Sequence, residues 1–207
     1  MLLCLYAFQY GADGWLGPLT ATALIITLAA LRRGPDQFLA RAFGALGAVL
    51  YLGLLGSAPL LIAHGFGPER ASEAGYLLMA VLAGIWLNDS AAYLAGRRWG
   101  HRKLAPVISP GKTVVGFVAG LVAGLVPVAL YPLVPSLPPI QLLGLLFATG
   151  LAGQLGDLVE SAIKRDLGVK DAPVLIPGHG GALDRFDSYF LAFPVVYLIL
   201  LALGLFQ

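Results

Sequence analysis

Charged side chains are scarce in this chain. They make up 12% of its 207 residues, whereas 58% of the residues are hydrophobic, and a soluble domain is about 25% charged. This composition excludes an ordinary soluble domain. The only cysteine, Cys4, excludes an intramolecular disulfide and a thiolate metal site. The first eleven residues lack the basic start of a signal peptide, so we expect no cleavable leader.

No linker marks a soluble domain and no convincing internal repeat is present, so the apolar stretches define the expected fold. We predict an all-α, polytopic integral membrane protein with about six transmembrane helices and a Gly-rich catalytic loop between the last two. We expect residues 1–84 to form a scaffold and residues 85–207 to form the catalytic region, with its signature at 154–188. The six predicted spans are Trp15–Leu31, Ala42–His64, Ala74–Leu94, Thr113–Leu133, Ile140–Ile163 and Asp184–Phe206.

The distribution of basic residues predicts the orientation of these spans. If the N-terminus lies outside, twelve of the thirteen Lys and Arg residues fall in or beside the loops that follow spans one, three and five. Basic loops face the cytoplasm, so the signature is expected at the cytoplasmic face. Arg70 lies on the opposite side, and we expect its neighbours Glu69 and Glu73 to be solvated in an outer loop.

The stretch 154–188 contains four of the basic and six of the acidic residues of the chain. Asp157, Glu160, Ser161 and Lys164 are spaced to share one helical face. Glycines and prolines from Gly168 onward then interrupt the helix. A second helix is expected to start near Leu183, with Asp184 and Asp187 on one face of its first turn. Two carboxylate-bearing helix ends, joined by a Gly-rich loop with Lys and His, suit a metal and a phosphate. The alternative is ordinary helix capping and dipole compensation.

Asp89 lies inside an otherwise apolar predicted helix, where a charge needs a partner. Its helical face also carries Tyr93 and Arg97. It can therefore line a polar cavity or form an ion pair with Arg97. The basic loop 97–112 that follows is either a topology determinant or a docking surface for phosphate head groups or nucleotide.

Two sets of residues resemble a known family. The first is Ser161-x-Ile-Lys164-Arg165-x4-Lys170-Asp171, followed by Pro177-x-His179-Gly180-Gly181-x-x-Asp184-Arg185-x-Asp187. The second is Asp89-Ser90-x-Ala92-Tyr93-x-x-Gly96-Arg97, followed by Ser109-Pro110-Gly111-Lys112-Thr113-x-x-Gly116. Both are similar to segments of the phosphatidate cytidylyltransferases, or CDP-diacylglycerol synthases, and together they cover about half of the chain. Departures occur at Pro173 and Ala182 in the loop, and at Gly111, Val114 and Val115.

This resemblance implies a reaction in which CTP and phosphatidic acid give CDP-diacylglycerol and pyrophosphate for phospholipid synthesis. It implies Mg²⁺ held by Asp157 and Asp184, with Glu160, Asp187 and Asp89 supporting it or holding a second cation. The expected catalytic residues are Asp157, Lys164, Arg165, Asp184 and Asp187. The expected substrate-binding residues are Asp89, Lys112, Ser161, Lys170, His179, Gly180, Gly181 and Arg185.

The resemblance further implies a homodimer in the lipid bilayer of the inner, cytoplasmic membrane, with the active site facing the cytoplasm and no nucleic-acid partner. Several alternatives stay open. A CDP-archaeol synthase or a polyprenol kinase would share the nucleotide but act on another lipid. A transporter would use paired discontinuous helices, and a structural subunit would not need the charged cluster. A CDP-alcohol phosphotransferase is excluded, because its Asp-Gly-x2-Ala-Arg motif is absent.

Overall fold

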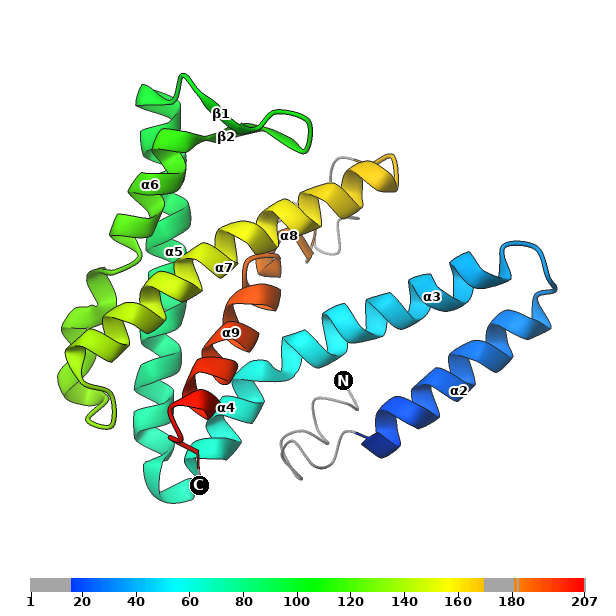
Figure 1. Ribbon diagram of the computed structural model, residues 1–207, viewed down its shortest axis with the longest axis horizontal. Coiled ribbons are helices and arrows are strands. Elements are labelled where there is room, and N and C mark those ends of the chain that lie inside the picture. The colour runs from blue at the N-terminus through cyan, green and yellow to red at the C-terminus, as the bar shows by residue number, and fades with distance from the viewer. Residues whose placement is uncertain (1–15, 170–180, 182, 207) are drawn as a thin grey trace.

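The computed structural model describes residues 16–169, 181 and 183–206, which form a helical bundle with one small β-hairpin (Figure 1). The N-terminal elements are α2 (Leu16–Arg32), α3 (Phe38–Ala48), the π-helical η2 (Val49–Leu54), η3 (Leu55–Ser57), α4 (Ala58–Phe66) and η4 (Pro68–Arg70). The central elements are α5 (Ala71–Trp99), β1 (Lys103–Ala105), β2 (Ser109–Thr113), α6 (Val114–Ala123) and η5 (Val126–Leu133). The C-terminal elements are α7 (Pro139–Asp166), α8 (Leu183–Phe186) and α9 (Tyr189–Ala202).

Five helical stretches within the described residues are long and apolar enough to cross a membrane: Phe38–Phe66, Pro68–Trp99, Val114–Leu133, Pro139–Asp166 and Asp184–Ala202. They correspond to the second through sixth predicted spans. At the first predicted span, α2 has 17 residues, fewer than the roughly 20 that a full crossing needs. The prediction of a multi-pass helical membrane protein is therefore confirmed, whereas the count of six spans is not. The expected division between residues 84 and 85 stays a prediction, and it falls inside α5.

Three of the predicted spans are irregular. In the second, η2 and η3 interrupt the α-helix between α3 and α4. The fourth breaks between α6 and η5, and prolines at 127 and 132 keep η5 from continuing as an α-helix. In the sixth, the Asp187 carboxylate accepts a hydrogen bond of 2.6 Å from the backbone N–H of Ser188. A side chain that bonds its neighbouring backbone competes with helix formation, and here α8 stops before α9 begins.

The basic loop after α5 is a hairpin, which the sequence reasoning did not predict. Strands β1 and β2 pair antiparallel, with Lys103 opposite Thr113 and Ala105 opposite Ser109. The hairpin leads directly into α6, because the Thr113 hydroxyl accepts a hydrogen bond from the backbone N–H of Gly116 and caps that helix.

Helices α5 and α6 lie side by side at very close range (Figure 1). A Cβ atom added at Gly116 would stand 2.5 Å from the carbonyl oxygen of Ala92, and one added at Gly120 would stand 2.8 Å from that of Asn88. Glycine at these positions therefore permits backbone contact between the two helices. Close packing through small residues is typical of helices in lipid, where the hydrophobic effect does not drive helix association.

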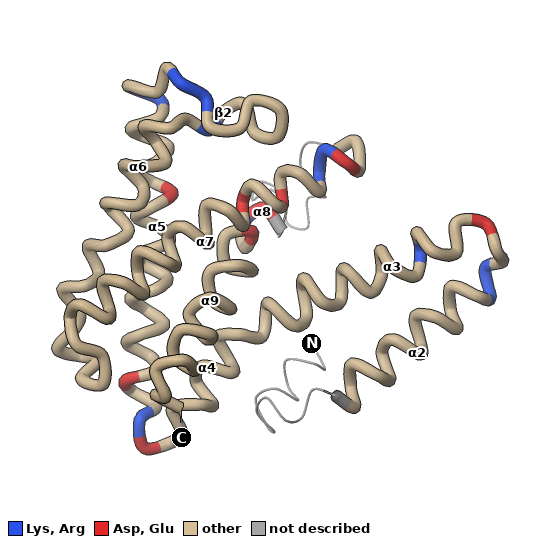
Figure 2. The backbone as a smooth tube through the Cα atoms, in the orientation of Figure 1, with Lys and Arg blue, Asp and Glu red and all other residues tan. Residues whose placement is uncertain are grey.

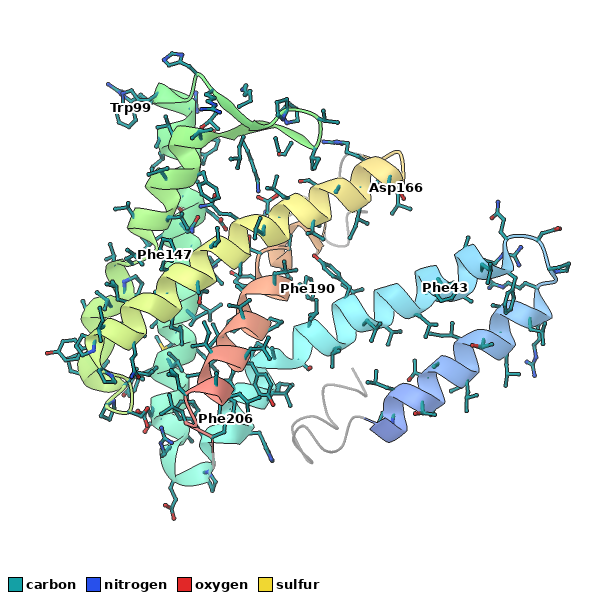
Figure 3. All side chains as sticks on the ribbon, in the orientation of Figure 1. Phe43, Trp99, Phe147, Asp166, Phe190 and Phe206 are labelled. Atoms are coloured by element: carbon teal, nitrogen blue, oxygen red, sulfur yellow. The ribbon has the colours of Figure 1, made fainter. Side chains whose placement is uncertain are left out.

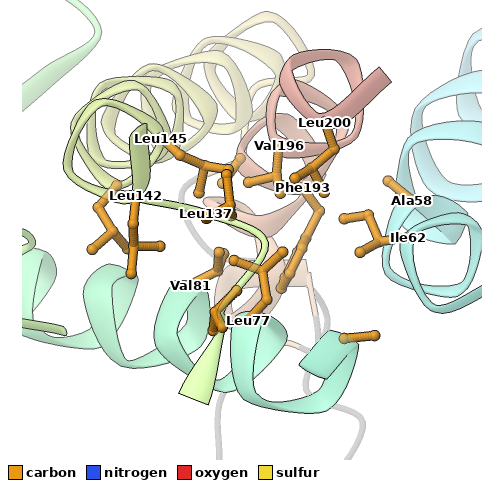
Figure 4. Packing of buried hydrophobic residues seen from close by; sticks show 14 of the residues in the cluster. Ala58, Ile62, Leu77, Val81, Leu137, Leu142, Leu145, Phe193, Val196 and Leu200 are labelled. Atoms are coloured by element: carbon orange, nitrogen blue, oxygen red, sulfur yellow. The ribbon is translucent and has the colours of Figure 1, made fainter. Parts of the chain in front are cut away.

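The apolar core occupies the end of the bundle away from the hairpin. Figure 4 shows side chains from α4, α5, α7, α9 and the 134–138 connection meeting there. Its fully buried members include Ile62, Leu77, Leu142, Val196 and Leu200. Side chains from four helices thus fix the relative positions of these helices at one end.

Glu73 at this end corrects an expectation, because it is not solvated. It is only 8% exposed, and it accepts hydrogen bonds from Arg70 Nε at 2.9 Å and from the backbone N–H of Ser136 at 2.7 Å. Arg70 also donates to the carbonyl of Leu205 and lies over the ring of Phe66. Glu73 was expected in solvent but is buried, and Arg70 links it to the C-terminal segment.

Most basic residues lie away from this end. Figure 2 shows basic residues around the hairpin, near the end of α7 and at the α2–α3 turn, and one further basic stretch beside acidic residues at the end near the C-terminus. This segregation along the helix axes is the arrangement from which the orientation was predicted.

The α5–α6 interface yields a stability prediction. The substitution Gly116→Ala should destabilise the protein by about 1–3 kcal/mol, because its methyl group overlaps the Ala92 carbonyl. On α7, the residue Gly144 has nothing within 4 Å of an added Cβ, so Gly144→Ala should be neutral or stabilise by up to about 1 kcal/mol. Thermal unfolding in detergent measures both. Equal melting temperatures for the two variants would contradict the close packing.

Candidate active site

A pocket of ≈ 660 Å³ opens beneath the hairpin. In Figure 3 this region lies between the labelled residues Trp99, at the end of α5, and Asp166, at the end of α7. Its walls come from α5, the hairpin, α6, α7, α8 and the turn before α9. The lining includes four carboxylates, from Asp89, Asp157, Asp184 and Asp187, and also Lys103 and Lys112. The pocket thus combines an acidic wall with basic groups from the hairpin.

The last turns of α7 carry one group of site residues. Asp157, Glu160, Ser161 and Lys164 share a face as predicted: Ser161 Oγ lies 3.4 Å from Asp157 Oδ1, and Lys164 Nζ lies 2.5 Å from Glu160 Oε2. The helix ends directly after them. Gly168 has a φ of 69°, and the N–H of Val169 bonds to the carbonyl of Lys164. This left-handed glycine cap stops α7 beside the site.

A close backbone contact brings Asp187, in the turn between α8 and α9, next to α7. A Cβ at Gly156 would stand 2.7 Å from the carbonyl oxygen of Asp187, so the turn between α8 and α9 lies directly against α7. As a result Asp187 comes within electrostatic range of Asp157. The expected start of a helix at Leu183 is confirmed, but it contains one turn only.

Two lysines compensate these carboxylates. Lys112 Nζ lies 2.7 Å from Asp157 Oδ2 and donates to the carbonyl of Gln154 at 3.2 Å. Lys164 Nζ donates to Asp184 Oδ1 at 2.6 Å while it contacts Glu160. Glu160 is fully buried, and a buried carboxylate is tolerated only with a cationic partner. Lys164 therefore links the carboxylates of α7 to α8.

Asp89 joins the same pocket from α5. Its electrostatic neighbours are Asp157 and Lys112. Arg97, the alternative partner considered from the sequence, donates instead to the Tyr93 hydroxyl at 3.2 Å. Of the two interpretations of Asp89, the structure favours the cavity lining.

The remaining predicted residues lie around this centre or outside the described part of the chain. Arg165 is exposed and donates to the Val169 carbonyl at 3.2 Å. Arg185 is exposed on α8, and Gly181 is buried. Lys170, His179 and Gly180 lie outside the described residues, as do Pro173 and Ala182.

The sequence reasoning missed two buried amides, Asn88 and Gln154. Gln154 Nε2 donates to Asn88 Oδ1 at 2.8 Å and to the Phe117 carbonyl at 3.1 Å, and Asn88 Nδ2 donates to the Gly150 carbonyl at 3.2 Å. Both residues lie within apolar helical segments, where uncharged polar side chains commonly bond between helices. This property could have revealed them.

The donor set suits a magnesium ion. Among the described residues, no three His, Cys, Asp or Glu side chains form a ready-made metal cluster. However, Mg²⁺ is commonly held by one or two carboxylates together with substrate phosphates and water. Asp157 and Asp184 line one pocket and each already contacts an ammonium group. These two residues fit such a site, and Asp89 and Asp187 supply additional carboxylate oxygens.

Comparison with known proteins identifies the family. The profile of the cytidylyltransferase family matches residues 1–203. The chain therefore belongs to this family.

The individual relatives are bacterial enzymes. The chain is 46% identical over 138 residues to the phosphatidate cytidylyltransferase of Staphylococcus aureus (strain COL), an alignment that covers 66% of this chain and 53% of that protein. It is 51% identical over 118 residues to the phosphatidate cytidylyltransferase of Bacillus subtilis (strain 168), covering 56% and 44%. The chain thus spans about half the length of the curated relatives it matches.

The buried ion pair of Lys164 and Glu160 yields a second prediction. Lys164→Met should destabilise the protein by about 3–5 kcal/mol, because it leaves Glu160 buried without its cation. Glu160→Gln removes that charge, so the double variant should be more stable than Lys164→Met alone. Thermal unfolding of the two single variants and the double variant measures this coupling. Strictly additive losses would contradict it.

Proposed function

We propose that this chain transfers CMP from CTP to phosphatidic acid, forming CDP-diacylglycerol and pyrophosphate. The observation that supports the proposal most directly is the pocket in which four aspartates meet Lys112. Its surroundings are apolar helices, so a lipid substrate can reach it while its head group remains in the polar pocket. The names of the relatives point to the same reaction.

The reaction itself needs charge neutralisation more than a base. An oxygen of the lipid phosphate attacks the α-phosphorus of CTP, a new P–O bond forms, and the bond to pyrophosphate breaks. The attacking phosphate monoester is already anionic at neutral pH. The protein must therefore bring two polyanions together and stabilise the charge on the transferring group.

The side chains of the pocket divide this work. We assign Asp157 and Asp184 to Mg²⁺, which supplies positive charge to the phosphate oxygens when bound. Lys112 and Lys164, which neutralise these carboxylates in the structure, are then able to contact phosphate oxygens instead. Asp89 and Asp187 support the metal or hold a second cation. Ser161, Arg165 and Arg185, together with Lys170, His179, Gly180 and Gly181, are assigned to substrate phosphates on the strength of the motif.

We further propose that the protein resides in the bacterial inner membrane with the pocket facing the cytoplasm, where CTP is available. The collection of basic residues at the pocket end supports this orientation. We also propose a homodimer, which the resemblance to the family implies.

The catalytic assignment predicts the effect of removing each metal carboxylate. Asp157→Asn and Asp184→Asn should each lower turnover by at least about 100-fold, since each removes a charge that holds the cation at the reacting phosphate. The matched control is Asp166→Asn, an exposed aspartate at the end of the same helix as Asp157, and it should retain activity. Pyrophosphate release by purified protein with CTP, phosphatidic acid and Mg²⁺ is the assay. Near-wild-type release by either site variant would refute the assignment.

The same assay separates the lipid alternatives. Omission of CTP, lipid or Mg²⁺ should each abolish release, as should EDTA. An archaeol-type or polyprenyl substrate in place of phosphatidic acid should give much lower release. A preference for one of those lipids would instead assign the chain to the corresponding related enzyme.

The orientation can be tested with single cysteines in a Cys4→Ser background. Glu69→Cys lies in η4 at the end opposite the pocket, and Asp36→Cys lies in the α2–α3 turn. In right-side-out vesicles a membrane-impermeant maleimide should label Glu69→Cys directly, and Asp36→Cys only after permeabilisation. The reverse pattern would place the pocket on the outer face.

A further inference from the structure

The two buried amides form a connection between three helices that the proposed reaction does not itself use. Asn88 on α5 is 2% exposed and Gln154 on α7 is 6% exposed. Gln154 Nε2 donates to Asn88 Oδ1 and to the carbonyl of Phe117 on α6, and Asn88 Nδ2 donates to the carbonyl of Gly150 on α7. Each amide thus makes two hydrogen bonds across a helix boundary, as buried polar groups in lipid require.

Two neighbouring glycines leave the space that the amide side chains occupy. A Cβ at Gly120 would stand 2.6 Å from Asn88 Oδ1 and 2.9 Å from Gln154 Nε2, and a Cβ at Gly150 would stand 2.8 Å from Asn88 Nδ2. No other residue type fits at these positions without moving the amides. Helices α5, α6 and α7 are therefore held at one spacing and one rotation about their axes.

The amides are also continuous with the pocket. Asn88 is adjacent in sequence to Asp89, and the backbone carbonyl of Gln154 accepts the hydrogen bond of Lys112, whose ammonium contacts Asp157. Rotation of α5 against α7 would separate Asp89 from Asp157. A shift of Gln154 would withdraw the carbonyl that holds Lys112.

We infer that Asn88 and Gln154 are positioning residues, which hold Asp89, Lys112 and Asp157 in the arrangement that phosphoryl transfer needs. This inference rests on the proposed function for its kinetic part, but its geometric part does not depend on turnover. A displacement of charged groups by about 1 Å can lower a rate by about 100-fold, so a connection that fixes these three side chains also controls the rate.

The test compares two variants that break the connection from different helices. Gln154→Met preserves length and volume but removes both donated bonds, and Asn88→Ala removes the acceptor from the α5 side. Both should lower kcat by about 10- to 100-fold, as loss of groups that orient metal ligands does, while the KM for CTP changes much less. The control is Thr149→Val, a buried residue of α7 whose hydroxyl bonds to Leu145 within the same helix. Its kinetics should match the wild type.

A second measurement needs no turnover. A carbodiimide joins an amine to a carboxylate only where the two are in contact, so it should couple Lys112 to Asp157 in wild-type membranes, and peptide mass spectrometry detects the product. Coupling should fall severalfold in Gln154→Met and Asn88→Ala and persist in Thr149→Val. Glu73→Gln serves as a stability control, because it weakens a buried interaction at the opposite end of the bundle.

The outcomes separate the two proposals. If the wild type couples Lys112 to Asp157 but shows no turnover with any lipid phosphate, the proposed function is wrong, and the coupling yield alone decides the positioning role. If Gln154→Met and Asn88→Ala keep both kcat and coupling, the inference is overturned. It is also overturned if they lose only melting temperature, as far as Glu73→Gln does, because the amides then stabilise the fold without positioning the site.

Discussion

Charged groups inside an apolar bundle are stable only when each has a partner, and the ion pairs of Lys112 and Lys164 meet this constraint at the pocket. Each lysine joins elements that are distant in sequence: the strand before α6 to α7 in one case, and α7 to α8 in the other. In the proposed reaction, the carboxylates of these pairs hold a cation of higher charge. Compensation of charge and preparation of the site are therefore one structural feature.

These pairs depend in turn on how closely the helices approach one another. Glycines at 116 and 120 bring α5 to α6, and Gly156 brings the turn before α9 to α7. Without these contacts the aspartates of α5, α7 and α8 would not share one pocket. The small residues thus contribute as much to the site as the charged residues do, although they contribute no chemistry of their own.

Features set by local sequence could be predicted, and features set by distant contacts could not. Apolar length predicted the crossing helices, and the spacing of Asp157, Glu160 and Lys164 predicted their common face. The hairpin was missed, because residues 97–112 show no alternation of apolar and polar residues. Glu73 was placed in solvent because its backbone partner lies 63 residues away. The Asn88–Gln154 bond spans 66 residues, and no local pattern reports such a pairing.

The contacts at the end of the bundle away from the pocket affect how the helices can move. There, Arg70 joins Glu73 and the carbonyl of Leu205, beside a core to which four helices contribute. The pocket end contains open volume and polar contacts instead. The packed core and the Arg70 contacts therefore anchor the helices to one another at the end away from the pocket. A small change in the angle between helices anchored there moves atoms near the anchor least and atoms beside the hairpin most. The pocket that the proposed function assigns to the lipid head group is therefore the part of the bundle most sensitive to such a change.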